Sequence, residues 1–579
     1  MAADGLVYNI KISSVGPANV TGSDLIYEPE TMGLAMKLHY IRGIYYFGSQ
    51  AFEGLSTLVI KEPMFTWLNK YPQVCGRFRR TETGRAYLKC NDCGVRFVEA
   101  KCDKTLDEWL EMKDATLEKL LVRDQALGPE LGFSPLVYIQ LTKFKCGGTA
   151  VGLSWSHVLG DAFSAAEFMN MLGRAVAGYD LGQPTSLAHS RTKVTTPNGP
   201  EKVGDDPLSI KRVGPVGDHW VNVTKCKMEA FSFNVTPTQL SHLQSKLSPN
   251  GTQFGAFEAL SAVIWQCIAK IREWDSNVVT ICKGSEESKT CDGTLSNSQV
   301  VSVVNANFQI LDSNPSELAL LVQNGALDER EKIEEAMERD GGLPDFIVYG
   351  AKLTFVNLED ARFYAFEYRG QRPVNISYRI EGVGEEGTIL VLPGPKGDDG
   401  GRSVMAILPE NEIEELKLEL KREAACDGLT GVDAHFMHTI PWRVSIIYHK
   451  AKAHKPDAQC FLFSTIFFYY NGNTKVHLTD PLEDWFRKVD VVVFIKAPIS
   501  LFFVPFLGEF RFSGFRSLQG ALSQTNHIPS TIDCLQGYLQ ITYQYCPWNQ
   551  IHKRESAASV GMKWAAREIS PCKADGQLP

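Results

Sequence analysis

The spacing of apolar residues predicts a β-hairpin in the first third of the chain. One apolar run covers residues 136–144 and a second covers residues 149–155. Gly147 and Gly148 lie between them, and a glycine pair is a strong turn signal between two such runs. In the second run bulky side chains alternate with small ones, which is the two-residue period of a strand. We therefore expect two antiparallel strands here.

A histidine stands at the end of the second predicted strand. If the pleat continues for one more residue, His157 lies on the same face as Leu153 and Trp155, beside bulky apolar side chains. Burial at that place favours the neutral imidazole. Catalytic groups tend to collect at strand-to-helix junctions, which makes His157 the candidate general base. The alternative is a histidine that is only a hydrogen-bonded core residue, which is the commoner case.

The residues after His157 predict a helix start. Gly160 permits a tight bend, and Asp161 precedes a run of good helix formers at 162–172. Asp161 has two candidate roles. As the third member of a triad it would orient His157, and as an N-cap residue it would only hold the end of the helix. The strong preference for aspartate at N-caps favours the structural role. A serine nucleophile at Ser154 or Ser156 is disfavoured, because the G-x-S-x-G pattern lacks its final glycine.

Helical and strand periodicities extend over most of the first 426 residues. Amphipathic helices are predicted at 32–46 and 106–121 in the first half. The second half adds a strand at 230–235, helices at 236–247, 257–272 and 412–422, and two strands joined by a glycine-rich loop within 388–407. The mixture predicts an α/β fold with mixed sheets.

Composition and charge limit the classes of function. With 579 residues and 44% hydrophobic content, the chain can fill two or more cores. A formal net charge of -8 argues against nucleic acid as a partner. The fourteen cysteines are scattered, and the Cys90/Cys93 pair has no second pair at a useful distance, so we expect no metal. The start has no secretory pattern and the apolar run 491–507 is interrupted, which predicts a cytoplasmic protein without a transmembrane segment.

The proline content divides the chain. Residues 182–217 carry five prolines and several glycines, as expected of a crossover linker between domains at 1–181 and 218–426. Residues 427–579 differ in character. They hold seven of the twelve histidines without zinc-ligand spacing and show no periodic pattern. We expect this extension to be either a poorly ordered appendage of unknown fold or a translated non-coding segment of a gene model.

Residues 1–426 resemble the plant BAHD acyltransferases. The segments that carry the resemblance are Ile139-Gln140-Leu141-Thr142-Lys143-Phe144, Cys146-Gly147-Gly148 and His157-Val158-Leu159-Gly160-Asp161, which is similar to the family's H-x-x-x-D region. Residues 36–43, 345–350 and 353–359 are most similar to the eceriferum and Glossy-like branch.

The resemblance implies two similar-sized α/β domains, like chloramphenicol acetyltransferase, with an active-site channel at their interface. His157 would take a proton from an acceptor hydroxyl or amine that attacks an acyl-CoA thioester, and Asp161 would hold the loop. Acyl-CoA would be a co-substrate, with no bound cofactor, and the resemblance identifies no residues that bind it.

Two departures from the family pattern bear on catalysis. Ala162 stands where most relatives have glycine, and the D-F-G-W-G signature is replaced by residues 365–369, in which only Phe366 is kept. The eceriferum-like branch shares this loss, and the resemblance implies a helper of an elongase condensing enzyme in very-long-chain fatty acyl elongation for cuticular wax. The alternative is an active acyl-CoA-dependent O- or N-acyltransferase. In both cases we expect a monomer at the cytosolic face of the endoplasmic reticulum.

Overall fold

The computed structural model describes residues 5–426 with eight gaps, and five strands beyond them. The gaps are at 23, 113, 183–204, 249–250, 273–276, 290–291, 312 and 396–399. Residues Met1–Leu429 form one compact unit and Thr430–Pro579 form a second. The two units are described separately, and the candidate site lies in the first.

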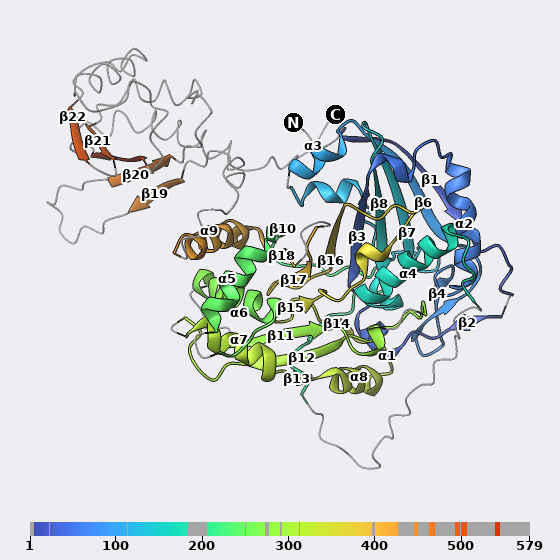
Figure 1. Cartoon of the computed structure of the whole chain (residues 1–579). Helices are drawn as coiled ribbons and strands as arrows, with labels where there is room; N and C mark the ends of the chain where they lie inside the picture. Colours follow the sequence, from blue (N-terminus) through green and yellow to red (C-terminus); the bar gives the residue numbers. More distant parts are fainter. Residues whose placement is uncertain are drawn as a thin grey trace, which may run out of the picture. The chain divides into compact units, whose positions relative to one another are not determined.

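A six-stranded sheet organises the first half of this unit (Figure 1). Its strands in spatial order are β1 (Val7–Val15), β6 (Val95–Cys102), β7 (Val137–Phe144), β8 (Thr149–Ser156), β3 (Tyr40–Phe47) and β16 (Asn375–Glu381). β7 pairs antiparallel with β8, which confirms the predicted hairpin. Helices α2 (Thr57–Asn69) and α4 (Ala162–Val176) pack together through Trp67 and Phe168, whose ring centroids are 4.1 Å apart.

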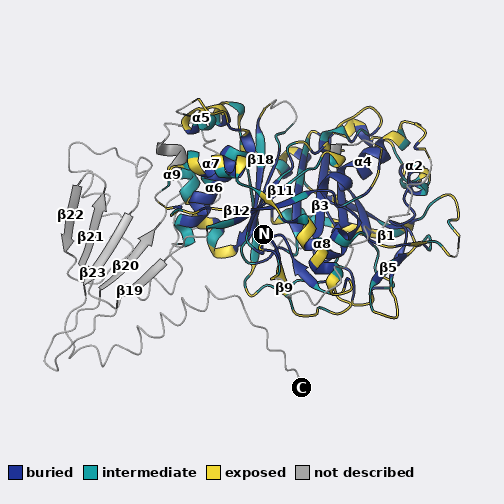
Figure 2. Ribbon diagram, turned by 90° about the horizontal axis from the view of Figure 1, so that it is seen from below, coloured by how far each residue is buried: buried dark blue, intermediate teal, exposed yellow. Residues whose placement is uncertain are grey.

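The other face of this sheet is covered by the helix α3 (Leu106–Glu111) and the 3-10 turn η2 (Leu117–Leu120). Leu106 and Trp109 pack there against Ile44 and Tyr46 of β3. Every residue of β3 and β8 is buried as a result (Figure 2). A small neighbouring sheet contains β2 (Ile26–Tyr27), β5 (Ala86–Lys89) and β4 (Arg77–Arg80).

A seven-stranded sheet organises the second half (Figure 1). Its order is β10 (Met228–Val235), β18 (Arg402–Pro409), β17 (Thr388–Pro393), β15 (Leu353–Asn357), β11 (Val278–Lys283), β12 (Val300–Asn305) and β13 (Leu327–Asp328). A second hydrophobic core contains the buried faces of α5 (Pro237–Leu247), α6 (Ala256–Arg272), α7 (Pro315–Asn324) and α9 (Glu410–Cys426). The strands and helices that we predicted in this half are confirmed.

The two halves share one core. The larger hydrophobic cluster joins β8 and α4 to residues that come from the second half, among them Val348, Tyr349 and Phe366. The strand β16 lies late in the chain and yet pairs antiparallel with β3, from Asn375 opposite Tyr46 to Glu381 opposite Tyr40. The domain boundaries at 1–181 and 218–426 stay a prediction. β16 belongs to the predicted second domain, and it completes the sheet of the first.

Two helix predictions in the first half are wrong. In place of one helix at 32–46, the short helix α1 (Thr31–Ala35) is followed by the strand β3. The strand is buried on both faces, so its continuous apolar run imitates the pattern of a buried helix. The predicted helix at 106–121 is divided into α3 and η2, because Asp114 accepts hydrogen bonds from the backbone and hydroxyl of Thr116 in a turn between them.

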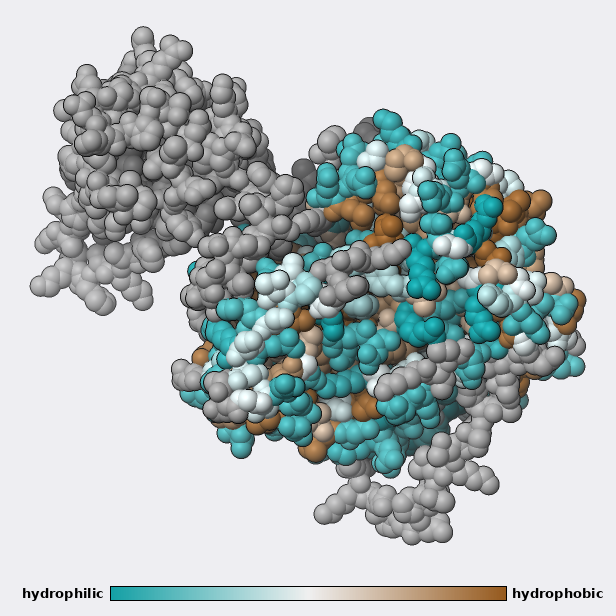
Figure 3. Space-filling model, in the orientation of Figure 1, coloured by the Kyte–Doolittle hydropathy of each residue, from teal (hydrophilic) through white to brown (hydrophobic). Residues whose placement is uncertain are grey.

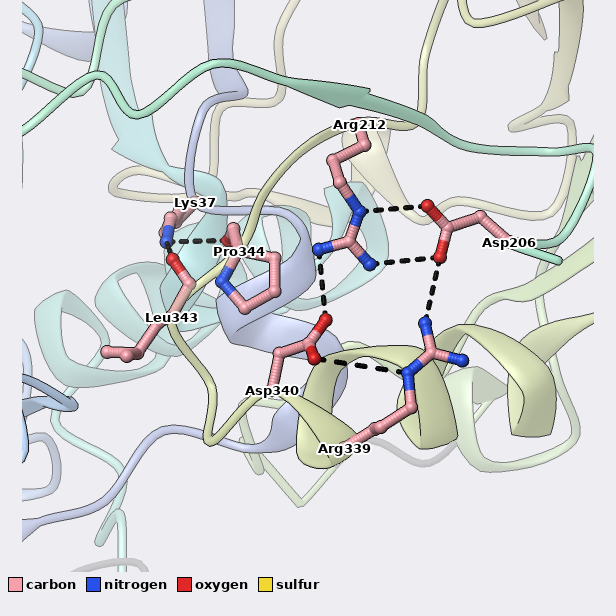
Figure 4. Close-up of polar contacts among 7 residues, drawn as sticks. All are labelled: Lys37, Asp206, Arg212, Arg339, Asp340, Leu343 and Pro344. Atoms are coloured by element: carbon pink, nitrogen blue, oxygen red, sulfur yellow. Dashed lines mark hydrogen bonds and ion pairs between the residues drawn. The ribbon is translucent and has the colours of Figure 1, made fainter. Parts of the chain in front are cut away.

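Charge pairs tie the crossover to the second half (Figure 4). Residues 183–204 of the predicted linker lie outside the described part of the chain, but β9 (Lys211–Val213) pairs antiparallel with β14 (Asp345–Ile347). Arg212 binds Asp206 and Asp340 at 2.9 Å, and Arg339 of α8 (Arg330–Arg339) binds Asp206 at 3.1 Å. These side chains are all more than a quarter exposed.

A buried ion pair lies beside this network. Lys37 and Asp345 are 2.8 Å apart, with side-chain exposures of 6% and 9%. The Lys37 ammonium also donates to the carbonyl oxygens of Leu343 and Pro344, at 3.1 and 2.8 Å. Figure 4 shows these two carbonyls facing the ammonium. The contacts tie the segment after α1 to the start of β14, which precedes the candidate site.

The second unit is described only in its strands. They are β19 (Ser445–His449), β20 (Phe463–Phe468), β21 (Val492–Ala497), β22 (Ser500–Pro505) and β23 (Leu539–Gln544), in the sheet order β19-β20-β23-β21-β22. The rest of residues 427–579 lies outside the described residues, so the prediction for this extension stays open.

One face of the first unit is mainly polar. In Figure 3 hydrophilic residues cover most of the coloured face of the first unit and apolar residues gather in separate patches. Among the described helices, none combines the length and the apolar composition that a membrane crossing requires.

Candidate functional site

His157 lies at the junction that the sequence predicted, but the strand does not set the direction of its ring. β8 ends at Ser156, and His157 begins the 3-10 turn η3 (His157–Leu159) before α4 starts at Ala162. The expected continuation of the pleat is therefore wrong. The His157 amide donates to the carbonyl oxygen of His39 at 3.2 Å, and the ring faces the rings of His39 and Tyr349.

Asp161 is the N-cap residue of α4, as predicted. One of its carboxylate oxygens, Oδ1, accepts a hydrogen bond from the Ser164 amide at 3.0 Å. The other, Oδ2, accepts from the Gln299 amide at 3.0 Å and from the Ser298 hydroxyl at 3.5 Å. Burial raises the pKa of Asp161 to about 6, although the amide hydrogen bonds oppose that shift. These contacts hold the loop before β12 against the start of α4.

Both nitrogens of the His157 ring have partners inside the protein. Nδ1 is 2.9 Å from Oδ1 of Asn297, and Nε2 is 3.0 Å from the Tyr349 hydroxyl. The amide of Asn297 also donates from Nδ2 to the His157 carbonyl oxygen at 3.1 Å. Gln299 lies on the far side of Tyr349, with Nε2 2.6 Å from the hydroxyl oxygen. His157 itself has an exposed fraction of 0%.

These contacts assign the tautomer of His157. The amide of Asn297 must present Oδ1 to the ring, because its Nδ2 is used by the His157 carbonyl. Nδ1 therefore carries the proton, and Nε2 carries the lone pair. The Tyr349 hydroxyl has one proton and two acceptors within reach, Nε2 of His157 at 3.0 Å and Oε1 of Gln299 at 2.9 Å, while Nε2 of Gln299 donates to the tyrosine oxygen at 2.6 Å.

The site contains two neutral histidines. Burial lowers the pKa of His157 to about 4 and the pKa of His39 to about 3, so both rings are uncharged at pH 7. The proximity of the two rings, whose centroids are 6.4 Å apart, lowers the pKa of His39 further. Nε2 of His39 accepts from the Val348 amide at 3.0 Å, which fixes the backbone beside Tyr349.

Two glycines allow the segments of the site to approach closely. A Cβ atom on Gly33 of α1 would lie 2.7 Å from the Val158 carbonyl oxygen in η3. Gly160, with a φ of 156°, would place a Cβ atom 2.7 Å from Cβ of Ser164. Neither contact is compatible with a larger residue unless the backbone moves.

Sequence reasoning missed most of the partners of His157. His39 and Tyr349 lie inside the segments 36–43 and 345–350 that mark the eceriferum-like branch, but the pattern assigns them no role. Asn297 and Gln299 lie in a stretch without periodicity. Tyr349 follows His157 by 192 residues, a separation at which no local spacing rule applies.

The altered D-F-G-W-G segment packs against the first sheet. Phe366 is fully buried, with its ring centroid 5.1 Å from that of Tyr45 and 5.4 Å from that of Phe47. Tyr368 stacks on Phe52 at 4.3 Å. These contacts give the segment a packing role.

The described residues contain no group of three or more histidine, cysteine or acidic side chains arranged to hold a metal ion.

Comparison with known proteins identifies the class and then the branch. Residues 38–283 match the model of the Transferase family. The chain is 39% identical to Protein ECERIFERUM 26 of Arabidopsis thaliana over 424 residues, which is 72% of this chain and 96% of the relative. It is 37% identical to Protein ECERIFERUM 2 of the same plant, over 72% of this chain and 98% of the relative. The chain therefore belongs to the BAHD acyltransferase family.

Solved structures agree with this fold. The crystal structure of vinorine synthase matches 72% of this chain and 98% of its own, with a TM-score of 0.53 and 17% identity. Fusarium graminearum TRI101 in complex with coenzyme A and deoxynivalenol matches 68% of this chain and 97% of its own, with a TM-score of 0.54 and 15% identity. At these identities the likeness concerns the fold alone.

Proposed function

We propose that this protein is an accessory factor in very-long-chain fatty acyl elongation for cuticular wax, and that it acts on an elongase condensing enzyme without proton transfer at His157. The observation that carries the proposal is the complete burial of the His157 ring and the use of both its nitrogens in hydrogen bonds. The ring has no exposed surface, and both of its nitrogens are used by Asn297 and Tyr349. The similarity to ECERIFERUM 26 and ECERIFERUM 2 over nearly their whole lengths supports the branch.

A general base needs a free lone pair within hydrogen-bond reach of the proton that it removes. The lone pair of His157 lies on Nε2, where the Tyr349 hydroxyl is 3.0 Å away. An acceptor hydroxyl could take that place only if Tyr349 moved, and the move would break the contacts of its hydroxyl with His157 and Gln299. The geometry favours a histidine that is part of the core.

The proposed ligand is a long acyl chain or its coenzyme A thioester. TRI101 has a similar fold, and its crystal structure in complex with coenzyme A supports this choice. We place the protein in the cytoplasm, at the cytosolic face of the endoplasmic reticulum, as a monomer that contacts the condensing enzyme. No bound cofactor or metal is part of the proposal.

The test is co-expression with a plant condensing enzyme in a host that lacks very-long-chain products. The lipid chain lengths are read by mass spectrometry, with the condensing enzyme alone as the control. We expect products longer than the condensing enzyme makes alone. An unchanged profile in cells that contain the soluble protein would contradict the proposal.

One observation favours a second function, an acyl-CoA-dependent O- or N-acyltransferase. His157 is neutral and carries its lone pair on Nε2, which is the protonation state that a base requires. In this case Tyr349 would leave when an acceptor binds. Purified protein would then transfer acyl groups from acyl-CoA to an alcohol or amine, and His157→Gln would abolish the transfer. Absence of transfer by the wild-type protein across chain lengths would argue against it.

A further inference from the structure

The buried hydroxyl of Tyr349 is placed where the acceptor of a transfer reaction would have to bind. Its oxygen is 3.0 Å from Nε2 of His157, which is the distance that a base requires from the proton donor. Tyr349 is 1% exposed and burial raises its pKa well above the usual value, so the hydroxyl keeps its proton at any physiological pH. The hydroxyl therefore stays protonated beside Nε2.

Three other contacts hold Tyr349 in this place. The Gln299 amide lies with Nε2 2.6 Å and Oε1 2.9 Å from the hydroxyl oxygen. The ring packs edge-on against His39 with centroids 4.9 Å apart. The backbone is fixed because Nε2 of His39 accepts from the Val348 amide at 3.0 Å and faces the Tyr349 amide at 3.4 Å. The tyrosine is therefore positioned from its hydroxyl, its ring and its main chain.

We propose that Tyr349 is a positioning residue that withholds His157 from proton transfer, because its hydroxyl lies against the Nε2 lone pair and is held there by Gln299. The inference deepens the accessory function and rests on it for its biological meaning. Its test reads the imidazole directly and does not depend on chain elongation, so the two proposals can fail separately.

The first test is the variant Tyr349→Phe, which keeps the ring and removes only the hydroxyl. The full-length protein is labelled with nitrogen-15 in histidine, and the ring nitrogens are followed by NMR over pH. The hydroxyl can donate to Nε2 of the neutral ring, and its oxygen can accept from the N–H of the protonated ring, so the readout is the nitrogen-15 signal of the neutral ring and not its pKa. We expect the Nε2 signal of the neutral ring to shift toward that of an unbonded lone pair. An unchanged Nε2 signal would overturn the proposal.

The matched control is Tyr378→Phe. Tyr378 is also 1% exposed, and its hydroxyl bonds to that of Tyr45 in the same compact unit. Its removal costs the core a similar hydroxyl but touches neither ring nitrogen of His157. We expect the His157 signals to stay at their wild-type positions. An equal change in both variants would mean that the effect is a general loosening of the core, and would refute a specific role of Tyr349.

A second test covers the case in which signals of the large protein overlap. Diethyl pyrocarbonate acylates neutral imidazoles that present a free lone pair, and the modified peptides are identified by mass spectrometry. His219 and His242 are exposed and serve as internal references. We expect His157 to be protected in the wild type. A wild-type His157 that reacts like His219 would overturn the proposal.

Discussion

The two buried histidines make stability depend on pH in a way that can be calculated. A histidine whose pKa falls from 6.5 in the unfolded chain to about 4 or about 3 in the folded one binds its proton only after unfolding. The stability is therefore full above pH 6.5 and is lost as the pH falls toward the folded pKa. Between pH 7.5 and pH 5, His157 and His39 each reduce the free energy of unfolding by about 2 kcal/mol.

Asp161 acts in the opposite direction. Its pKa rises from 3.8 to about 6 on folding, so its contribution is full below 3.8 and is lost as the pH rises through 6. On acidification to pH 5 it returns about 1 kcal/mol. The three groups together predict a net loss of about 3 kcal/mol between pH 7.5 and pH 5. Buried carboxyl groups elsewhere add their own terms, which cancel when a variant is compared with the wild type.

The perturbation that isolates His157 is His157→Gln, which removes the titrating group. We expect the variant to lose about 2 kcal/mol less than the wild type over the same pH range. The assay is urea unfolding followed by tryptophan fluorescence at pH 7.5, 6.5, 5.5 and 5.0. A constant cost of the substitution does not matter, because only the change with pH is compared. Equal losses in both proteins would refute the claim that His157 is buried in its neutral form.

Three further predictions concern how the segments around the site are held. Lys37→Met leaves Asp345 buried without its cation, and should lower the free energy of unfolding by about 3–5 kcal/mol in urea titrations. Arg212→Met removes the charge of a side chain that is 38% exposed, so the free energy of unfolding should fall by only about 0–1 kcal/mol. This loss should vanish in about 1 M NaCl. A loss as large as that of Lys37→Met would contradict the ranking. Gly33→Ala places a methyl group 2.7 Å from a carbonyl oxygen, and should cost about 1–3 kcal/mol, which the melting temperature would reveal.

Local features of the fold could be predicted from the sequence, whereas long-range ones could not. The turn glycines between β7 and β8, the N-cap at Asp161 and the apolar helix α6 each depend on neighbours within a few residues, and all three are confirmed. The strand β3 was predicted as a helix because both of its faces are covered, which removes the alternation that identifies a strand.

The candidate site divides in the same way. The junction that carries His157 follows from local pattern, but the direction of the ring depends on Asn297 and Tyr349, which are 140 and 192 residues away. Their contacts exist only after the two halves share a core. The role of His157 also depends on them. The local sequence is the same for a catalytic base and for a core histidine, and the two differ only in the group that lies against Nε2. That occupant could be found only in the structure.

The central claim is that the protein functions without proton transfer at His157. The most direct measurement is the lipid chain-length profile of cells that co-express a plant condensing enzyme with either the wild-type protein or His157→Gln, at matched amounts of soluble protein. We predict that both proteins extend the products to the same length. Extension by the wild type that disappears in His157→Gln would contradict the claim and would assign the histidine a chemical role.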